Sequence, residues 1–203
     1  MQDFIGKNID RYHITEQIGL GGMAVVYKAY DMRLERYVAL KLIRTEAVPQ
    51  LHYERLMRRF EREAKAQARF SHPNIVPAYD YGVVDGMPFM VLAYMPGGTL
   101  KDRIRGAMPV ENALSILIPI TDEVAYAHHM GVLHRDIKPS NILFSTNSRP
   151  MLTDFGIAKL LELNEETLTG TGLGVGTPEY MAPEQWQGRA CEATDQYALG
   201  VVL

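Results

Sequence analysis

The chain has 203 residues, of which 47% are hydrophobic and 22% are charged, a composition typical of a soluble globular protein with a substantial core. Its 21 Lys and Arg against 24 Asp and Glu give a formal charge of -3, so it lacks the basic excess that nucleic acid or anionic lipid attracts. One cysteine, Cys191, excludes an internal disulfide framework and a cysteine-only metal site, and it suits a reducing compartment. We expect this side chain to be buried or half-buried.

The first half of the chain has mostly the pattern of β-strands, interrupted by one helix. The strand segments are rich in β-branched and aromatic residues. Residues 51–70 instead place Leu56, Phe60 and Ala64 four apart, which makes the apolar stripe of an amphipathic helix. The predicted strands are residues 12–19, 24–31, 36–43 and 88–94.

The pattern becomes helical after a Pro-Gly-Gly joint at residues 96–98. Residues 110–131 form the clearest helix, and Pro119 should bend it. The joint is therefore the predicted boundary between a β-rich lobe, residues 1–95, and an α-rich lobe, residues 96–203. Together they predict an α+β fold.

The sequence predicts neither a leader nor a membrane span. Residues 1–10 lack a basic stretch followed by an apolar core, and no run approaches the roughly 20 apolar residues that cross a bilayer. Residues 195–203 have a helix-like apolar pattern with no capping Gly and no closing basic turn. We therefore expect a cytoplasmic location for this chain, and we expect it to end inside a helix.

The segment GLGGMAVVY, residues 19–27, places glycines between two predicted strands. Glycines let backbone N–H groups approach phosphate oxygens closely, so such a loop can fold over a nucleotide. A plain hairpin turn explains clustered glycines equally well. The segment is not a Walker loop, because no Gly-Lys-Ser/Thr follows. The glycines alone are weak evidence for a nucleotide loop, and without other motifs they favour the hairpin.

Lys41 is the one charge at the end of the apolar segment VALK. A surface lysine that extends from a strand is the common case. A lysine that binds phosphate needs a carboxylate to hold it, and the predicted helix offers Glu61 and Glu63. At 100° per residue Glu63 is marginally nearer the centre of the apolar stripe. Helix phase alone does not decide between the two.

Charged and polar residues gather in two later segments, VLHRDIKPSNILF and LTDFG. Asp154 and an amide oxygen of Asn141 are hard oxygen ligands suited to Mg²⁺. Asp136 lies five residues before Asn141, so one loop can offer a base to a hydroxyl and a ligand to the metal. Lys138 can neutralise a phosphoryl group during its transfer. A solvated turn explains any one of these residues, but the whole set in this order favours phosphoryl transfer.

Taken in order, these motifs resemble those of a protein kinase. The order is a Gly-rich loop, VALK, a helix with Glu63, HRDIKPSN, DFG, APE and DQYALG, and it spans nearly the whole chain. In the family's register Glu63, rather than Glu61, stands ahead of SHPNIV. Lys138 and Thr177 stand where serine/threonine kinases carry them. The segments GGMAVVYKAYD and APEQWQG resemble the eukaryotic-like (Hanks-type) kinases of bacteria, and the fold this implies is bilobal.

The resemblance implies a catalytic role for each matching residue. Asp136 would accept the proton of the substrate hydroxyl, and Lys138 would lie near the γ-phosphate of ATP. Asn141 and Asp154 would hold Mg²⁺, for which Mn²⁺ is a substitute. The implied partners are ATP and proteins that carry Ser or Thr, with no nucleic acid.

The nucleotide would bind mainly to the first lobe. Lys41, paired with Glu63, would hold the α- and β-phosphates. Val26 and Ala39 would enclose adenine together with Leu143, and the backbone at residues 93–95 would bind its edge. The residues implied in ATP binding are Gly19, Leu20, Gly21, Gly22, Val26, Ala39, Lys41, Ala93, Met95 and Leu143.

The segment between DFG and APE, rich in Thr and Gly, is the implied regulatory element. A phosphorylated threonine there can dock on Arg135, because its charge of about -1.5 to -2 makes strong hydrogen bonds to a guanidinium. Thr169 and Thr171 are the expected acceptors, and Lys159 is a second cation. Thr177 is instead expected to contact the catalytic loop through its hydroxyl.

The sequence departs from the kinase pattern at two points, and two other classes of protein are alternatives. Ala24 replaces the third glycine of the Gly-rich pattern, and the later helices of the family's second lobe, with the basic partner of Glu184, are missing, so we expect residues 1–203 alone to be nearly inactive. A pseudokinase or docking module would usually lose Lys41, Asp136 or Asp154. A small-molecule phosphotransferase would lack GTPEYMAPE. A homodimer and a membrane anchor elsewhere in the full-length protein stay open.

Overall fold

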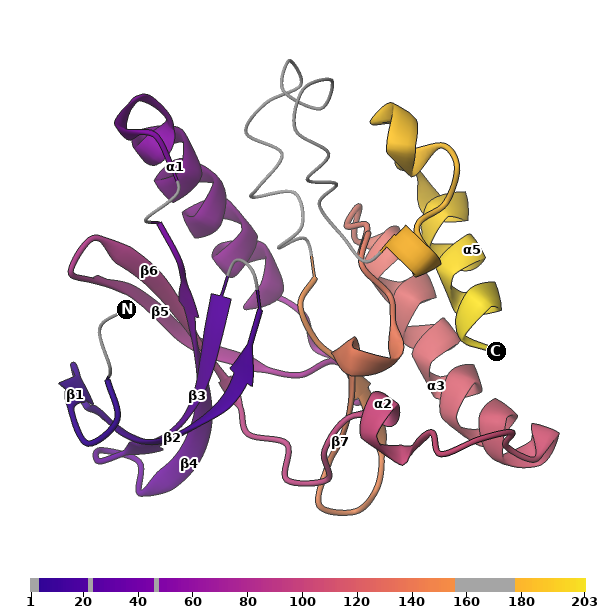
Figure 1. Ribbon diagram of the computed structural model, residues 1–203, viewed down its shortest axis with the longest axis horizontal. Coiled ribbons are helices and arrows are strands. Elements are labelled where there is room, and N and C mark those ends of the chain that lie inside the picture. Colours follow the sequence, from indigo (N-terminus) through magenta and orange to yellow (C-terminus); the bar gives the residue numbers. More distant parts are fainter. Residues whose placement is uncertain (1–3, 22–23, 46–47, 156–177) are drawn as a thin grey trace. The chain divides into compact units, whose positions relative to one another are not determined.

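A computed structural model describes residues 4–21, 24–45, 48–155 and 178–203 (Figure 1). The chain forms two compact units. The first comprises Met1–Arg69 and Pro77–Tyr94, and the second comprises Phe70–Val76 and Met95–Leu203. The first is built on a β-sheet and the second mainly on helices, so the predicted α+β fold is confirmed.

The first unit is an antiparallel sheet with one long helix. The sheet has the strand order β1-β2-β3-β4-β6-β5 in the described part of the chain. The four predicted strands and the predicted helix are all present, whereas β5, whose apolar pattern is interrupted by Asp80 and Gly82, was not among the predictions. The elements are β1 (Asn8–Ile9), β2 (Tyr12–Leu20), β3 (Ala24–Asp31), β4 (Arg36–Ile43), α1 (Gln50–Gln67), β5 (Ala78–Val84) and β6 (Met87–Ala93).

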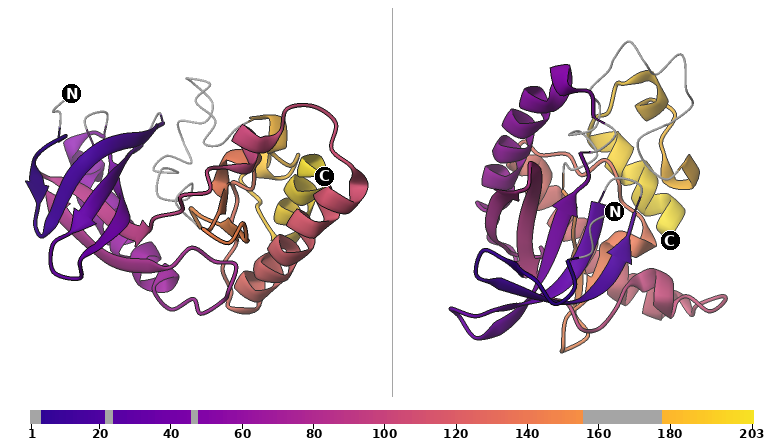
Figure 2. Two further views of the ribbon diagram at one scale, coloured as in Figure 1. Left: turned by 90° about the horizontal axis from the view of Figure 1, so that it is seen from below. Right: turned by 60° about the vertical axis from the view of Figure 1, so that its left-hand side comes forward.

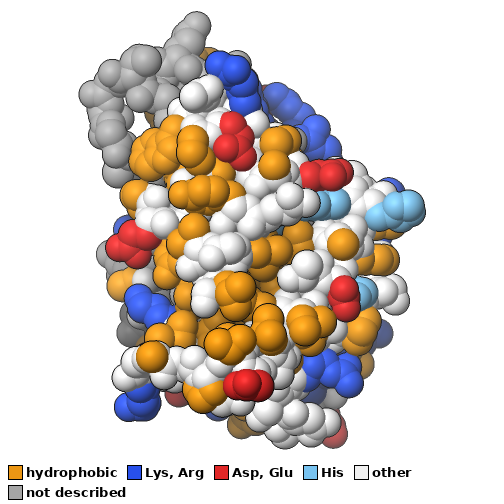
Figure 3. Space-filling view, turned by 90° about the vertical axis from the view of Figure 1, so that its right-hand side faces the viewer, with side chains coloured by type: hydrophobic (Ala, Val, Ile, Leu, Met, Phe, Trp, Pro, Cys, Tyr) orange, Lys and Arg blue, Asp and Glu red, His pale blue; other side chains and the backbone are white. Residues whose placement is uncertain are grey.

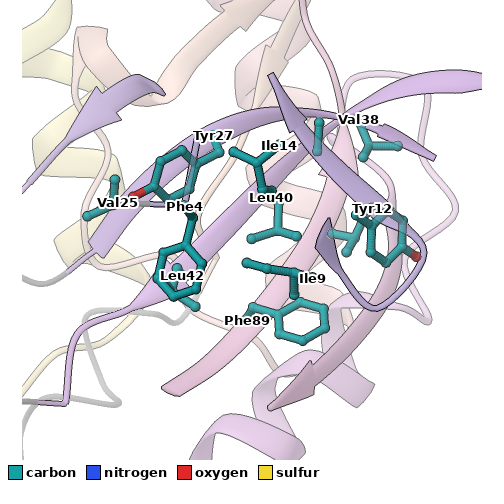
Figure 4. Packing of buried hydrophobic residues seen from close by; sticks show 12 residues of the cluster. Phe4, Ile9, Tyr12, Ile14, Val25, Tyr27, Val38, Leu40, Leu42 and Phe89 are labelled. Atoms are coloured by element: carbon teal, nitrogen blue, oxygen red, sulfur yellow. The ribbon is translucent and has the colours of Figure 1, made fainter. Parts of the chain in front are cut away.

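Alternation along β3 decides which side chains enter the core of this unit. Val25, Tyr27 and Ala29 are buried, whereas Val26 and Lys28 between them are only half-buried. This period of two is that of a strand with one face on a core. Figure 4 shows how the buried side chains of β2, β3, β4 and β6 pack together with those of Phe4 and Ile9.

The helix α1 packs against β5 and β6 (Figure 2). The predicted stripe of Leu56, Phe60 and Ala64 is buried. Gln67 continues the stripe and is also buried, although a polar side chain there was not expected. Tyr53 donates a hydrogen bond of 2.8 Å to the backbone oxygen of Gly86, which ties the start of the helix to the turn between β5 and β6.

The second unit is built around α3 and a small two-stranded sheet of β7 and β8. Helix α3 runs through Pro119 without interruption. Apolar side chains of α3, the small sheet and α5 form one core with Ile75 and Phe155. The described elements are α2 (Leu100–Arg103), α3 (Val110–His129), η1 (Pro139–Asn141), β7 (Ile142–Phe144), β8 (Pro150–Leu152), η2 (Pro178–Tyr180), η3 (Gln185–Gln187) and α5 (Glu192–Val202).

The expectation for Cys191 was wrong. Cys191 is exposed, not buried or half-buried, because it is the N-cap of α5 and lies outside the apolar side of the helix.

Among the described residues, no helix combines the length and the apolar character that crossing a membrane requires. Figure 3 shows a face of the molecule on which hydrophobic side chains gather. The exposed apolar side chains of α3 and α5 are Val110, Leu114, Ile118, Tyr197 and Val201.

The Pro-Gly-Gly joint is fixed to the small sheet by a close backbone contact. The N–H of Gly97 donates to the oxygen of Phe144 at 2.9 Å, and the N–H of Phe144 donates to the oxygen of Gly98 at 2.9 Å. A Cβ atom at Gly97 would lie 2.6 Å from the oxygen and 2.7 Å from the Cβ of Phe144. Only glycine therefore allows this approach.

We expect Gly97→Ala to lower the free energy of unfolding by about 1–3 kcal/mol, because the added methyl forces the joint away from β7. Gly200→Ala is the matched control: a Cβ there meets nothing within 4 Å, and alanine is the better helix former. Chemical denaturation of the full-length variants measures both. Equal stability of Gly97→Ala and wild type would contradict the close contact.

Candidate active site

The Gly-rich segment, residues 19–27, begins at the end of β2 and continues into β3, and these two strands pair antiparallel. Gly19 and Leu20 end β2, and the N–H of Gly21 donates to the oxygen of Ala24 at 2.9 Å. Gly22 lies outside the described residues. The hairpin interpretation is thus correct for the backbone, and a hairpin loop is also a geometry that can present N–H groups to phosphates. A hairpin and a nucleotide-binding loop, the two interpretations of this segment, are therefore compatible.

Lys41 lies in the central part of the sheet with only 7% of its surface exposed. It is opposite Val26 of β3 on one side and Met90 of β6 on the other. Ala39, two residues earlier, is opposite Lys28 and Leu92. Burying an ammonium group is costly unless it has anionic or hydrogen-bonding partners. Lys41 is therefore not the surface lysine of the common case.

The two candidate acids on α1 have different environments. The side chain of Glu63 is 13% exposed, and its Oε1 lies 3.7 Å from Nη2 of Arg62. The side chain of Glu61 is 52% exposed and pairs with Lys65 at 2.6 Å, one helical turn away. Packing thus places Glu63 on the more buried side of the helix, which helix phase alone left undecided.

The residues expected to bind adenine are divided between the two units. In the first unit, Val26 is half-buried and Ala39 is buried. The N–H of Ala93 donates to the oxygen of Pro77 at 2.9 Å, so this N–H is already used within the fold. Met95 and Leu143 belong to the second unit, where Leu143 is the half-buried residue of β7 between two buried neighbours.

Asp136, Lys138 and Asn141 form one hydrogen-bonded cluster. Lys138 Nζ lies 2.7 Å from Oδ2 and 3.0 Å from Oδ1 of Asp136. Nδ2 of Asn141 donates to the backbone oxygen of Asp136 at 2.7 Å and to its Oδ2 at 3.0 Å. The amide nitrogen is thus fixed by Asp136, and its orientation leaves Oδ1 as the atom that can bind a metal.

Asp154 follows β8 and is connected to Asn141 through one intervening residue. The N–H of Thr153 donates to the backbone oxygen of Asn141 at 3.0 Å, and strand pairing sets Leu152 opposite Ile142. Asp154 itself has φ 72°, a backbone conformation that residues other than glycine rarely adopt. Strained backbone of this kind is held by its surroundings and gathers at functional sites.

His134, which the sequence analysis did not single out, connects the two halves of this cluster. Its Nδ1 accepts the N–H of Asp136 at 3.2 Å, so Nε2 carries the ring proton and donates to the oxygen of Thr153 at 2.9 Å. Its ring contacts that of Phe155 at 4.6 Å between centroids. The side chain is fully buried.

Asp195 on α5 holds the backbone that precedes Asp136. Its Oδ2 accepts the N–H of His134 at 2.8 Å, and its Oδ1 accepts the N–H of Arg135 at 2.7 Å. His128 at the end of α3 donates from Nε2 to Oδ2 at 2.7 Å. The sequence showed Asp195 only as the first letter of DQYALG. Its role depends on chain segments about sixty residues apart, which no local pattern reveals.

Part of the expected regulatory set lies in the described residues. Arg135 has φ 69°, and its backbone oxygen accepts a hydrogen bond of 2.8 Å from Gln185. Glu184 of APE accepts a hydrogen bond of 2.8 Å from the hydroxyl of Thr194. Four residues of the expected set lie outside the described residues: Lys159, Thr169, Thr171 and Thr177.

The donor set is appropriate for magnesium. In the described ranges no three His, Cys, Asp or Glu side chains gather into a metal cage. One carboxylate, Asp154, and one amide oxygen, that of Asn141, are the candidate ligands. Mg²⁺ usually takes one or two protein oxygens and completes its shell with water and phosphate oxygens, so the two residues fit a Mg²⁺ that is shared with a nucleotide.

Comparison with known proteins decides the family. The protein kinase domain matches residues 12–203. The chain belongs to the protein kinase domain family. A probable serine/threonine-protein kinase of Clostridium perfringens is 41% identical over 98% of this chain. The serine/threonine-protein kinase PrkC of Bacillus subtilis is 42% identical over 98% of it. The chain covers 29% and 31% of the length of these two relatives.

Solved structures have the same fold. The structure named PpkA-294 apo form has a TM-score of 0.81 at 28% identity and covers 97% of this chain, which covers 75% of that one. The PknI kinase domain of Mycobacterium tuberculosis has a TM-score of 0.74 at 28% identity, with coverage of 97% and 72%. The resemblance to bacterial Hanks-type kinases is therefore confirmed.

We expect Asp136→Asn in the full-length protein to lower kcat by about 10²–10⁴, the range for losing a positioned base. The amide keeps the size of the side chain but cannot accept a proton, so nucleotide affinity should stay nearly unchanged. Steady-state kinetics together with an ATP-binding titration measure both quantities. Glu111→Gln, an exposed acid of α3, is the control. A kcat equal to that of wild type would contradict the assignment of Asp136.

Proposed function

We propose that this chain is the catalytic part of a protein serine/threonine kinase that transfers the γ-phosphate of ATP to hydroxyl groups of proteins. The observation that supports this most is the cluster of Asp136, Lys138 and Asn141, held beside the strand that leads to Asp154. It offers a base, a cation and two metal ligands within one unit. The names of the relatives point to the same activity.

In this proposal each residue of the cluster has a separate task. Asp136 accepts the proton of the attacking hydroxyl, which must lie within hydrogen-bond reach of its carboxylate. Lys138, already 2.7 Å from Asp136, offsets negative charge on the transferring group. Asn141 and Asp154 would hold Mg²⁺. When bound, the ion supplies charge neutralisation at the phosphates, and Mn²⁺ is a chemically similar substitute.

The proposed nucleotide contacts begin with Lys41, which binds the α- and β-phosphates and is oriented by Glu63. Burial of Lys41 and the low exposure of Glu63 support this pairing. We assign residues 1–95 to an ATP-binding lobe and residues 96–203 to a catalytic lobe. The other proposed ATP contacts are Gly19, Leu20, Gly21, Gly22, Val26, Ala39, Ala93, Met95 and Leu143.

A pseudokinase or docking module is the second candidate. Kinases that lose activity usually lose the phosphate-binding lysine, the base or the metal-binding aspartate. Lys41, Asp136 and Asp154 are all present, and the described contacts of Asp136 give it a cation and an ordered backbone. We therefore favour the active enzyme.

Location and assembly are further parts of the proposal. The single cysteine suits the reducing cytoplasm, where ATP and Mg²⁺ are abundant. The apolar side chains exposed on α3 and α5 favour association, so we expect residues 1–203 expressed alone to aggregate or pack loosely and to be nearly inactive. For the full-length protein, a homodimer is the assembly we propose.

One experiment tests the function and its proposed regulation together. The full-length protein is incubated with labelled ATP, Mg²⁺ and a mixture of proteins, and mass spectrometry then locates the phosphate. We expect phosphate on Ser and Thr of the protein mixture, and on Thr169, Thr171 or both in the kinase itself. A phosphothreonine there would dock on Arg135 through charge-assisted hydrogen bonds.

The double variant Thr169→Ala with Thr171→Ala should then lower kcat and leave ATP affinity nearly unchanged. Absence of any transfer by the wild type would contradict the kinase activity. Transfer without phosphate at either threonine, or full activity of the double variant, would contradict only the regulation.

A further inference from the structure

Glu123 is a carboxyl group inside the apolar core of the second unit. It lies on α3, and its side chain is fully buried, with 0% of its surface exposed. Its helix neighbours Ile120, Val124 and Ala127 belong to the core cluster that also contains Leu152 and Phe155. An ionised carboxylate is expensive to bury without a cation or several hydrogen-bond donors. The surroundings of Glu123 therefore decide its charge.

The described contacts give Glu123 a single hydrogen bond. Its Oε2 accepts the backbone N–H of Leu152 at 3.3 Å. The same N–H donates to the oxygen of Asn74 at 2.8 Å, so the two acceptors share it. Oε1 is buried and has no hydrogen-bond partner among the described residues. One shared N–H cannot compensate a full negative charge.

Burial raises the pKa of Glu123 from its ordinary value of 4.5 to about 10, and the Leu152 N–H opposes the rise only in part. Glu123 is thus an uncharged acid at neutral pH. The strand β8 carries no titratable side chain. On the segment 70–76, His72 stacks on Tyr126, and on α5 Asp195 is bound to His128.

The residue that Glu123 contacts, Leu152, lies two residues before the proposed metal ligand Asp154. Leu152 ends β8, and the next residue, Thr153, binds the backbone of Asn141 and the ring of His134. A shift of Leu152 would therefore be passed to Asp154 and Asn141 together. Glu123 connects α3 to this point from the interior of the unit.

We propose that buried Glu123 is a positioning residue for Asp154, on which it acts through its hydrogen bond to the backbone of Leu152. The inference rests on the proposed function, because it assigns Asp154 to Mg²⁺. An apolar side chain would fill the same space but would leave the N–H of Leu152 only one of its two acceptors, the oxygen of Asn74. Glutamine is the closest neutral substitute, since its amide oxygen can accept the same N–H.

The first measurement compares the pH dependence of stability of wild type and Glu123→Gln in the full-length protein. Glu123 is ionised above pH 4.5 when unfolded but stays neutral up to about pH 10 when folded, so its contribution is complete below pH 4.5 and is lost as the pH rises towards 10. We expect the folding equilibrium constant of wild type to fall relative to Glu123→Gln by up to about tenfold per pH unit between pH 6 and 8.

Asp122→Asn, which removes an exposed carboxylate next to Glu123 on the same helix, is the matched control and should follow wild type. Parallel profiles of wild type and Glu123→Gln would overturn the buried neutral acid. This measurement needs no phosphoryl transfer, so it decides about Glu123 independently of the catalytic assignment.

The second measurement is the Mg²⁺ concentration that gives half-maximal phosphoryl transfer. Glu123→Leu removes one of the two acceptors of the Leu152 N–H, so it should raise this concentration by about two- to tenfold, the effect of one hydrogen bond. Glu123→Gln should stay within about twofold of wild type, because it restores the acceptor. A purely structural role would lower stability without changing the Mg²⁺ requirement of the folded enzyme.

Equal Mg²⁺ requirements of the Leu and Gln variants would overturn the positioning role. A Glu123→Leu variant that fails to fold while Glu123→Gln folds normally would support the need for an acceptor at this place. Absence of any transfer by the wild type would overturn the proposed function and, with it, the positioning role. If the pH profiles of wild type and Glu123→Gln diverge in the same preparation, Glu123 is a buried neutral acid even though the proposed function has failed.

Discussion

The arrangement of the candidate active site depends on one buried carboxylate, that of Asp195. It accepts the N–H groups of His134 and Arg135 at 2.8 and 2.7 Å and a hydrogen bond from His128 at 2.7 Å. Only 1% of Asp195 is exposed, so these donors are what make its burial tolerable. In return the carboxylate fixes two successive backbone units directly before Asp136, including Arg135 at its unfavourable φ of 69°.

A short chain of hydrogen bonds connects the backbone held by Asp195 to the proposed catalytic side chains. His134 receives the N–H of Asp136 on one ring nitrogen and donates to the oxygen of Thr153 from the other. Thr153 in turn donates its N–H to the backbone of Asn141, whose side chain binds Asp136. The proposed base and the proposed metal ligands are thus held by neighbours that do no chemistry themselves, as preorganised sites require.

Much of the fold could be predicted because its periodicity is strong. Alternation in β3 and the four-residue spacing of Leu56, Phe60 and Ala64 are local signals, and the structure bears them out. The choice between Glu61 and Glu63 was not local: it depends on which flank of α1 packs against the sheet. Cys191 was misjudged because its position as a helix cap, rather than its apolar character, decides its exposure.

The sequence motifs predicted only those residues of the candidate site whose own side chains are proposed to carry the chemistry. Asp136, Asn141 and Asp154 stood out because their side chains are unusual between apolar runs. The contributions of Asp195, Thr153 and Glu123 could not be found this way, since each acts on the backbone of a residue far away in the sequence.

The kcat of full-length Asp195→Asn tests this account most directly. Losing a charge-assisted hydrogen bond should lower kcat by about 10- to 100-fold at unchanged ATP affinity, whereas a kcat equal to that of wild type would contradict it.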